Sequence, residues 1–533
     1  MISVSREWKE LSKQTLLPET FVEITCTITE PGLQGDAVAS ATNPEEFSDL
    51  EQIVDVEKNA SEMYATLDYG AWGLDGNYGY SNGNPKYPGY VNTNYSDENG
   101  SAQATITIDF SYRHTLSIPG ITIVWSEIFG GWATSFRVRT YNSNGLVSQI
   151  TVTDNESPVS EVWFELLDYT QIQIDVLGWS HPFQRIRCND ITLGIKLMYT
   201  KDDLLSYEHS QNVDLLSAAL PKNEIKFSLR NDDNRWNPDN PSNIEQYLLE
   251  QQEVRVRYGM DVNGETEWIK GGTFWLSEWE TPSNGMEASF TARDAVGFME
   301  TIYDGVRSGT FYEIAVDALE QADLTVLDDG NVRYALDSCL KEISADFSTT
   351  DDEYTISEVL QLIAHACNCV FYQDRNGVIR IEPWVRNYSG YVLEQDLCFS
   401  HPEYTTNKPL KAVSVAYGSD AKVVINNGSK GETQTVDNPF ITTENHAVRV
   451  GEHAREILNN RKVISGDFRA DMTLDVLDNI VVTSKYASNI IGITDMKYST
   501  NGGAFKGTYT GRVISVRLSP TFYYSGETHV GEA

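Results

Sequence analysis

Apolar and polar residues alternate along much of the chain, and this pattern predicts strands over most of its length. The first such segment is 19–30 (ETFVEITCTITE), whose polar positions carry acidic and hydroxyl side chains. Its apolar residues fall on one face: Val22, Ile24, Cys26 and Ile28. The segment is therefore predicted to be a half-buried strand. Beyond it, Gly, Ala, Ser, Asn and acidic residues predominate up to residue 55, where we place a domain boundary.

Short predicted strands recur at nearly regular intervals in the next part of the chain. They cover 104–110, 121–127, 135–141, 146–152, 161–167, 171–177 and 190–197. Turn pairs such as Asn144-Gly145 separate them. This spacing is typical of an antiparallel β-sandwich or jelly roll, so we assign residues 56–195 to that fold.

Beyond the predicted sandwich, the strand pattern of the first thirty residues returns, for example at 224–230 and 253–259. The strand at 19–30 has no sheet partner nearby in the sequence, and the predicted sandwich is closed in itself. Insertions are tolerated at exposed loops whose ends lie close together. We therefore expect residues 1–55 and 196–300 to form one small β-barrel, interrupted by the sandwich.

Helical periodicity is concentrated at 301–400, where we expect a mixed helix–strand domain. Thr355-Ile-Ser-Glu358 is a capping box that opens an amphipathic helix predicted over 355–368. Short strands with Gly-rich turns then resume and predict a second β-barrel at 401–533. The predicted fold class is mainly β, with two small barrels, a helix–strand unit and an inserted antiparallel sandwich.

Composition agrees with this fold class. Aromatic residues make up 11% of the 533 residues, with 28 Tyr and 11 Trp, which favours strands. No apolar run reaches the roughly 18 residues that a membrane helix needs, so we expect no membrane helix. The start lacks the apolar segment of a signal peptide, so we expect no secretion signal. The scattered cysteines fit reduced, mostly buried thiols made in a cytoplasm. They are Cys26, Cys188, Cys339, Cys367, Cys369 and Cys398.

The net charge is −37, from 77 acidic and 40 basic side chains. Proteins hold nucleic acid largely by neutralising its phosphates with Lys and Arg, so tight nucleic-acid binding is not expected. Transient passage of DNA is a different matter, because an acidic wall repels phosphates and does not retain a sliding polymer.

Parts of the predicted sandwich carry a family resemblance. Residues 64–77 (YATLDYGAWGLDGN), 104–110 (ATITIDF) and 171–180 (QIQIDVLGWS) together resemble a discoidin-type, galactose-binding-like domain. Such domains often bind glycans or lipids through loops at one end, and many others only pack against neighbouring proteins. The resemblance therefore implies either a ligand site or a structural contact.

Four passages in the rest of the chain resemble, in their order, baseplate hub and tail-tip proteins of bacteriophages and related contractile injection particles. They include 226–241 (KFSLRNDDNRWNPDNP), 271–280 (GGTFWLSEWE), 357–384 (SEVLQLIAHACNCVFYQDRNGVIRIEPW) and 475–484 (DVLDNIVVTS). The resemblance implies a homotrimeric ring with two barrels per subunit, located in the virion tail after synthesis in the bacterial host cytoplasm. Its implied partners are a tail tube or distal tail protein, a spike or tip protein, surrounding baseplate proteins and a tape measure protein. We expect the channel of such a ring to be acidic or neutral.

The loop from Trp72 to Tyr95 is the best candidate for binding a small ligand. Sugars are recognised by aromatic faces that stack on their C–H groups and by amides or carboxylates that bind their hydroxyls. The candidate carbohydrate-binding residues, two of them from a later loop, are Trp72, Asp75, Asn77, Tyr78, Tyr80, Tyr87, Tyr90, Trp179 and His181. A host-surface glycan is the corresponding ligand, and a calcium ion near Asp75 is a further hypothesis.

Catalytic constellations are not recognisable in the sequence, whether a nucleophile with a His partner, a His-Glu-x-x-His site or a carboxylate pair. His365, Cys367 and Cys369 have the chemistry to hold zinc. Cys367 continues the apolar stripe of the predicted helix, however, so we interpret the cluster as core. We expect no catalytic residue, no metal ligand and no cofactor. The alternatives to a structural hub are a carbohydrate-binding adhesion protein of the tail and a cell-wall glycan hydrolase.

Overall fold

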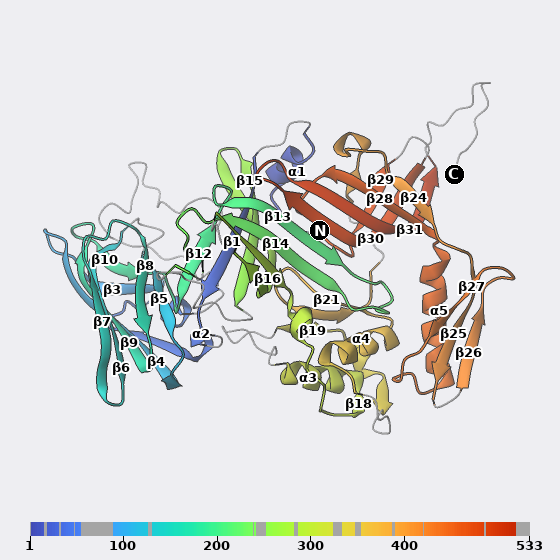
Figure 1. Ribbon diagram of the computed structural model, residues 1–533, viewed down its shortest axis with the longest axis horizontal. Coiled ribbons are helices and arrows are strands. Elements are labelled where there is room, and N and C mark those ends of the chain that lie inside the picture. Colours follow the sequence, from blue (N-terminus) through green and yellow to red (C-terminus); the bar gives the residue numbers. More distant parts are fainter. Residues whose placement is uncertain are drawn as a thin grey trace.

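The computed structural model confirms a mainly β protein (Figure 1). Its hydrophobic residues form three large clusters, in the sandwich at the left of Figure 1, inside the central sheet and around the helices below it. Among the residues described, no helix has the length and apolar character needed to cross a membrane. The structure describes residues 2–14, 19–30, 33–46, 48–54, 89–125, 131–237, 239–240, 252–281, 286–322, 333–346, 353–385, 390–418, 421–483 and 487–518.

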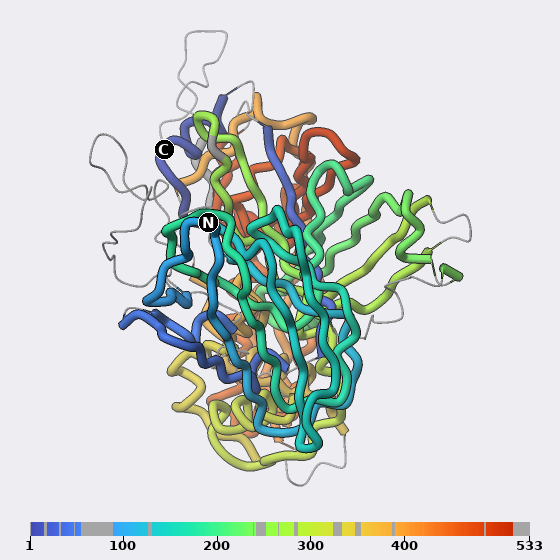
Figure 2. The backbone as a smooth tube through the Cα atoms, turned by 90° about the vertical axis from the view of Figure 1, so that its left-hand side faces the viewer, coloured from blue at the N-terminus to red at the C-terminus, as the bar shows by residue number. Residues whose placement is uncertain are grey.

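The sandwich packs a five-stranded sheet, in the order β2-β4-β9-β6-β7, against the three-stranded sheet β11-β5-β8 (Figure 2). The larger sheet consists of β2 (Ala37–Ala41), β4 (Ser101–His114), β9 (Tyr169–Trp179), β6 (Ala133–Asn142) and β7 (Gly145–Val152). The smaller sheets consist of β11 (Asp190–Thr192), β5 (Ile118–Val124), β8 (Val159–Leu166) and the pair β3 (Tyr90–Tyr95) and β10 (Arg185–Cys188). Alternate residues of the long strands enter the core, as Ile106 and Ile174 do.

The central sheet replaces the two barrels predicted from the sequence. Within the described residues it joins thirteen strands, and neither it nor any other sheet closes into a barrel. Along the main path its strands are β12 (Ile195–Tyr199), β1 (Thr20–Ile28), β15 (Glu253–Val262), β16 (Glu265–Glu280), β17 (Glu287–Arg293), β14 (Lys222–Arg230), β13 (Leu204–Asn212), β30 (Ala487–Thr500), β31 (Lys506–Leu518), β28 (Lys462–Arg469) and β24 (Glu403–Thr406). Beside this path, β29 (Asn479–Thr483) pairs with β30 and with β23 (Val392–Leu393).

The prediction of separate barrels fails because β13 uses both of its hydrogen-bonding edges. On one side it pairs with β14, and on the other it pairs with β30 over the register from Tyr207↔Thr500 to Asn212↔Asp495. Strands that were assigned to different barrels therefore share one antiparallel ladder. A local sequence pattern shows which side chains of a strand are buried, but not which strand occupies its second edge.

Strand β1 lies between β12 and β15, strands that follow it in the sequence by about 170 and 230 residues. Its last residue, Ile28, is the register partner of Ile195, the first residue of β12. The chain thus leaves the central sheet for the sandwich and returns to it at adjacent points of one ladder.

The helix–strand unit packs α3 (Phe311–Gln321) and α4 (Ile356–Ala366) against a small sheet in the order β19-β22-β21. The predicted capping box is present, because Glu358 N donates to Thr355 Oγ1 at 3.3 Å and the Glu358 carboxylate accepts from Thr355 N at 2.8 Å. The strands of this unit are β19 (Tyr334–Leu336), β21 (Val370–Gln373), β22 (Ile379–Glu382) and the pair β18 (Ser308–Thr310) and β20 (Ser344–Asp346).

A second helix-bearing unit lies inside the region that was predicted to be purely a barrel. Here α5 (Glu444–Asn459) packs on the sheet β26-β25-β27, at the right of Figure 1. Its strands are β25 (Leu410–Tyr417), β26 (Ala421–Asn426) and β27 (Glu432–Val436). Shorter helical segments elsewhere are α1 (Arg6–Leu11), α2 (Leu33–Asp36), η1 (Glu51–Ile53), η3 (Ala295–Phe298), η4 (Ser338–Lys341) and η5 (Gln395–Leu397).

Candidate functional site

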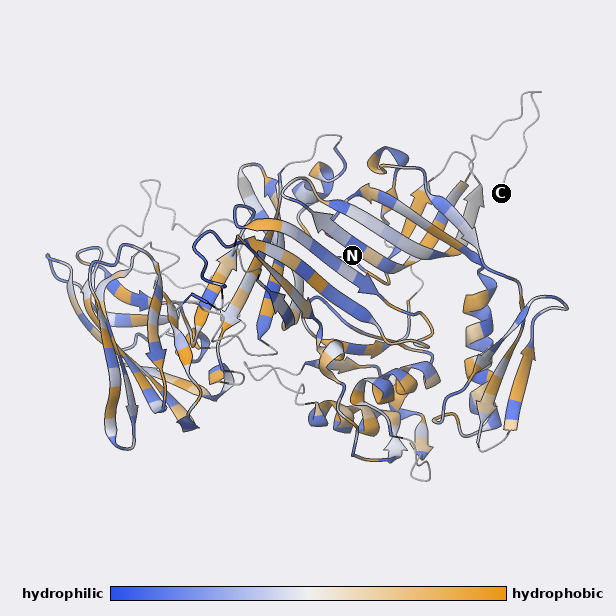
Figure 3. Ribbon diagram, in the orientation of Figure 1, coloured by the Kyte–Doolittle hydropathy of each residue, from blue (hydrophilic) through white to orange (hydrophobic). Residues whose placement is uncertain are grey.

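The outward side of the central sheet is polar and continuous across both halves of the chain. We call it the polar sheet face and define it by central residues that point away from the core, none of which is buried. They are Arg293 of β17; Glu224, Lys226 and Ser228 of β14; Ser206, Glu208 and Ser210 of β13; Asp495, Lys497 and Ser499 of β30; Lys506, Thr508 and Thr510 of β31; and Asp467 of β28. Figure 3 shows hydrophilic positions recurring along these strands.

The basic side chains of the polar sheet face are all paired with carboxylates. The face carries four carboxylates and four basic groups, whereas the whole chain carries a net charge of −37. Three pairs join neighbouring strands, because Glu224 lies opposite Arg293, and Glu208 and Asp467 lie diagonal to Lys497 and Lys506. The fourth carboxylate, Asp495, accepts a hydrogen bond from Asn212 Nδ2 at 2.5 Å. The ion pairs are Glu224–Lys226 at 3.1 Å, Glu224–Arg293 at 3.5 Å, Glu208–Lys497 at 2.7 Å and Asp467–Lys506 at 2.7 Å.

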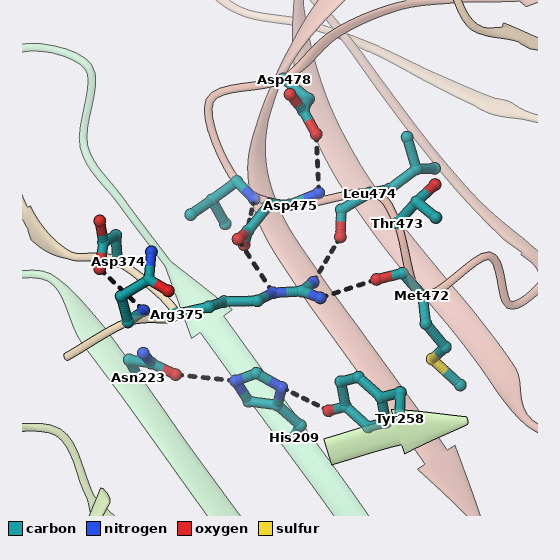
Figure 4. A network of polar contacts seen from close by, with 12 residues as sticks. His209, Asn223, Tyr258, Asp374, Arg375, Met472, Thr473, Leu474, Asp475 and Asp478 are labelled. Carbon is teal, nitrogen blue, oxygen red and sulfur yellow. Dashed lines mark hydrogen bonds and ion pairs between the residues drawn. The ribbon is translucent and has the colours of Figure 1, made fainter. Parts of the chain in front are cut away.

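Beneath this face, one arginine connects the helix–strand unit to the central sheet (Figure 4). Arg375 stands in the turn between β21 and β22, and its side chain is only 4% exposed. The guanidinium donates to Met472 O at 2.7 Å and to Leu474 O at 2.5 Å, and it forms an ion pair with Asp475 at 3.0 Å. A buried cation is tolerated only when it is paired and hydrogen-bonded in this way.

A neutral histidine continues the buried network. His209 Nε2 donates to Asn223 Oδ1 at 2.8 Å, and His209 Nδ1 accepts from the Tyr258 hydroxyl at 2.8 Å. The proton therefore resides on Nε2, because the amide oxygen can only accept. Burial lowers the pKa of His209 to about 4, and the charge of Arg375 adds to this effect. At neutral pH the network holds the Arg375–Asp475 pair and an uncharged imidazole.

An open cleft of about 530 Å³ lies beside Arg375. Residues from β16, the β21–β22 hairpin and the loop before β29 line it, including Trp268, Tyr372, Arg380 and Asp478. Burial raises the pKa of Asp478. The cleft mixes acidic and basic side chains without a nucleophile next to a base, so its lining does not define a reaction.

The sequence-predicted carbohydrate residues are only partly within the described part of the chain. Trp72, Asp75, Asn77, Tyr78, Tyr80 and Tyr87 lie outside the described residues, as does the proposed calcium position near Asp75. The structure places Tyr90 and Trp179 in the sandwich core, at 0% and 3% exposure, so their rings offer no open face. The Tyr90 hydroxyl donates to Thr42 O at 2.6 Å, and Trp179 packs edge-on against Trp125.

His181 is exposed, and other aromatic residues surround it at one end of the sandwich. Its ring packs edge-on against Trp132 at 5.8 Å between ring centres, while Ser96 Oγ donates to His181 O at 2.7 Å. The loop continues to Phe183, which is 54% exposed with a left-handed φ of 56°. We call this set the sandwich loop face; it consists of Tyr95, Trp132, His181 and Phe183. Tyr95 ends β3, Trp132 precedes β6, and His181 and Phe183 share the loop after β9, so no single run of sequence contains all four residues.

The H-x-C-x-C cluster is part of the core of the helix–strand unit, as predicted. Cys367 and Cys369 are 7% and 0% exposed, and burial lowers the pKa of His365. Within the part of the chain that the structure describes, no three His, Cys, Asp or Glu side chains are grouped to hold a metal ion.

By its fold the protein is a mainly β chain with a central sheet, a helix–strand unit and a sandwich. Solved phage tail proteins are among its structural neighbours. A prophage MuSo2 43 kDa tail protein from Shewanella oneidensis matches with a TM-score of 0.40 and 12% identity, over 59% of this chain and 94% of that one. A tail protein from Neisseria meningitidis matches with a TM-score of 0.41 and 11% identity, over 60% of this chain and 93% of that one. A family 32 carbohydrate-binding module from C. perfringens NanJ, solved with galactose, matches 33% of this chain and 99% of its own, with a TM-score of 0.20 and 16% identity.

No protein-family model matches the chain, and no curated protein matches it. The structural likenesses are distant, at 16% identity or less for these three structures.

Proposed function

We propose that the protein is a structural hub subunit of a phage or phage-like tail, and that three copies form a ring around a channel. The observation that carries this proposal is the polar sheet face. It runs unbroken through the β13–β30 ladder, and its basic side chains are paired with carboxylates within the sheet. A channel wall for a tape measure protein and then DNA needs such a surface.

The physical reason is that each phosphate neutralised by a free cation releases counterions and adds to binding. Lys226, Lys497 and Lys506 already lie beside carboxylates, so they hold a passing duplex weakly. The hydroxyl groups between them bind water and exchange it readily. In the ring, this face lines the channel, and the acidic remainder of the chain faces outward.

Ring closure also explains the exposed end of the central sheet at β24. Within the described residues β24 pairs only with β28, so it is an edge strand. Its four side chains are all exposed, and Phe399 just before it is 62% exposed. Natural proteins usually cover or blunt such edges. A neighbouring copy docked there buries Phe399. It pairs with β24 across chains in the way that β13 pairs with β30 within one chain.

In this arrangement the chain between β1 and β12 forms an inserted domain that projects from the discontinuous unit on either side of it. The domain begins earlier than the expected bounds of 56–195, because β2 pairs with β4 of the sandwich and Leu33, Ile53 and Val54 lie in the sandwich core, so these residues do not belong with the predicted unit of 1–55 and 196–300. Residues 301–400 and 401–533 complete the hub. A tail tube or distal tail protein binds above the ring, a spike or tip protein binds below it, and other baseplate proteins surround it. The protein then resides in the virion tail and needs neither cofactor nor catalytic residue.

Native mass measurement tests the ring. The expected species has the mass of three chains, and Phe399→Asp reduces it to the mass of one. Val424→Asp is the matched control, because Val424 is 47% exposed on β26, away from the proposed contact. A monomeric wild-type protein, or a Phe399→Asp variant that remains trimeric, contradicts the proposal.

Carbohydrate binding by the sandwich is a second candidate function, favoured by the sandwich loop face. Exposed aromatic rings beside polar groups suit the apolar faces of sugars, and Tyr95 and Phe183 are 43% and 54% exposed. Binding to host-surface glycans on an array should be lost in Phe183→Ala and kept in Leu146→Ala, an exposed residue of the distal β6–β7 hairpin. The same preparation should release no reducing ends from cell walls; release above the buffer control supports the glycan hydrolase alternative.

A further inference from the structure

Two thiols of the helix–strand unit lie in contact although thirty residues separate them in the sequence. Cys339 Sγ and Cys369 Sγ are 3.5 Å apart. Both are free thiols in the structure. A disulfide brings its sulfurs to about 2.05 Å, so small rotations of the two side chains close the remaining gap.

The two cysteines differ in their access to solvent. Cys369 begins the β21 region and is 0% exposed, whereas Cys339 lies in η4 and is partly exposed. The start of η4 is fixed because Asp337 Oδ1 accepts from Cys339 N at 2.8 Å. An oxidant from solvent therefore reaches Cys339 first, with Cys369 waiting directly behind it.

A third cysteine orients the buried thiol. Cys369 Sγ donates to Cys367 O at 3.6 Å, so the backbone of Cys367 holds the Cys369 sulfur toward η4. The Cys369 sulfur contacts the sulfur of Cys339, which makes Cys339 its disulfide partner. The hydrogen bond with Cys339, together with burial, holds the pKa of the Cys369 thiol far above its usual range. Direct oxidation of the Cys369 thiol is thereby slow, so the reaction begins at Cys339.

The segment that carries Cys339 is held to the unit by few backbone contacts. Residues 333–346, which we call the strap, pair through Tyr334–Leu336 with β22 and through Ser344–Asp346 with β18. Between these two short ladders, Cys339 packs on the hydrophobic cluster of the helices. A covalent bond at this point fastens the middle of the strap to the start of β21.

We propose that Cys339 and Cys369 are a modification site that forms an intramolecular disulfide once the protein leaves a reducing compartment. The co-reactant is a small-molecule disulfide. The Cys339 thiolate attacks one sulfur of that disulfide, whose S–S bond breaks and releases one small thiolate, which takes up the proton lost by Cys339. The Cys369 thiol then gives up its proton and attacks the Cys339 sulfur, which expels the second small thiol. Two protein thiols are oxidised, and one small disulfide is reduced to two thiols.

Thiol counting on the full-length protein tests this inference. The chain has six cysteines, so the reduced, denatured protein titrates six thiols. After incubation of the folded protein with oxidised glutathione, we expect four thiols and a peptide cross-link between Cys339 and Cys369. The oxidised form should melt at a higher temperature than the reduced form, and Cys339→Ser should abolish that difference.

Variants separate the proposed order of attack from simple packing. Cys369→Ala removes the second thiol, so Cys339 should accumulate as a mixed disulfide with the mass of one added glutathione. Cys26→Ser, a cysteine in a distant strand, should still lose two thiols on oxidation. Retention of all six thiols, a cross-link through Cys367, or cross-linking between chains overturns the inference.

Discussion

Replacement of Arg375 should selectively loosen the contact between the helix–strand unit and the central sheet. Its guanidinium donates two hydrogen bonds to carbonyls of the 472–474 segment and pairs with Asp475. It also lies over the rings of Tyr258 and Tyr498, at 5.7 and 6.0 Å from the ring centres. One side chain thus touches β15, β30 and the loop before β29.

The expected magnitude follows from burial. Hydrogen bonds to a charged group contribute about 1.5–3 kcal/mol each, and removal of one partner from a buried ion pair costs about 3–5 kcal/mol. The Asp475 side chain is 23% exposed, so water compensates part of its loss. We expect Arg375→Met, which keeps the length of the side chain but not its charge, to lower the free energy of unfolding by about 3 kcal/mol.

The assay is hydrogen exchange by mass spectrometry, read in peptides from β13 and β30, with denaturant unfolding alongside. Arg293→Met is the matched control, because Arg293 is 40% exposed and forms ion pairs with Glu224 and Glu278. Exposed pairs contribute roughly 0–1 kcal/mol. Combining Arg375→Met with Asp475→Asn should show a coupling of about 1–2 kcal/mol. Equal losses of stability in Arg375→Met and Arg293→Met would show that Arg375 does not hold the helix–strand unit to the central sheet.

Three further predictions concern protonation and the attachment of the sandwich. Burial lowers the pKa of His209 from 6.5 to about 4, so between these pH values the unfolded chain binds a proton that the folded chain excludes. The free energy of unfolding should therefore fall as the pH drops from 6.5 to 4, and urea unfolding of His209→Gln should show a weaker dependence on pH. For Asp294 the change of stability with pH has the opposite sign, because burial raises its pKa from 3.8 to about 7. The free energy of unfolding should fall as the pH rises through this range. Asp294→Asn should therefore be more stable than the wild type at pH 8, about one unit above that pKa, but not at pH 4. Replacing residues 30–193 with a short Gly/Ser turn should leave the central sheet folded, because Ile28 and Ile195 are register partners; an unfolded product in circular dichroism counts against the inserted-domain arrangement.

Local pattern predicted elements well where burial alone determines them. Strand β1 was predicted with its apolar face, and Val22, Ile24 and Ile28 are buried. The same strand shows the limit, since Glu23 is 5% exposed and pairs with Arg257 of β15. No alternation pattern announces a buried carboxylate, because its partner lies more than 200 residues away.

Tertiary pairing accounts for the predictions that failed. The second edge of β13 is occupied by a strand from the far end of the chain, which turned two predicted barrels into one open sheet. Helix α5 was missed although Ala447, Val450, Ala454 and Ile457 recur at helical spacing. Arg375 sits in a turn sequence, Asp374-Arg-Asn-Gly377, that normally faces solvent, and only the docking of the hairpin buries it.

Of the candidate ligand residues in the described part of the chain, only His181 lies on the exposed sandwich loop face. Tyr90 and Trp179 stand at strand ends, and the structure buries both faces of each ring. The sequence alone does not show that the second face of each ring is covered. Phe183 and Trp132 come from separate loops, and their proximity depends on the pairing of β6 with β9.

The proposal of a hub subunit depends most on the polar sheet face lining the channel of a threefold ring. A cryo-electron microscopy map of the assembled protein would show both the symmetry and the surface that faces the axis. We expect a ring of three copies in which β13, β14, β30 and β31 surround the channel and Lys226, Lys497 and Lys506 remain paired with carboxylates. A ring whose channel is lined by another surface, or by unpaired Lys and Arg, would contradict it.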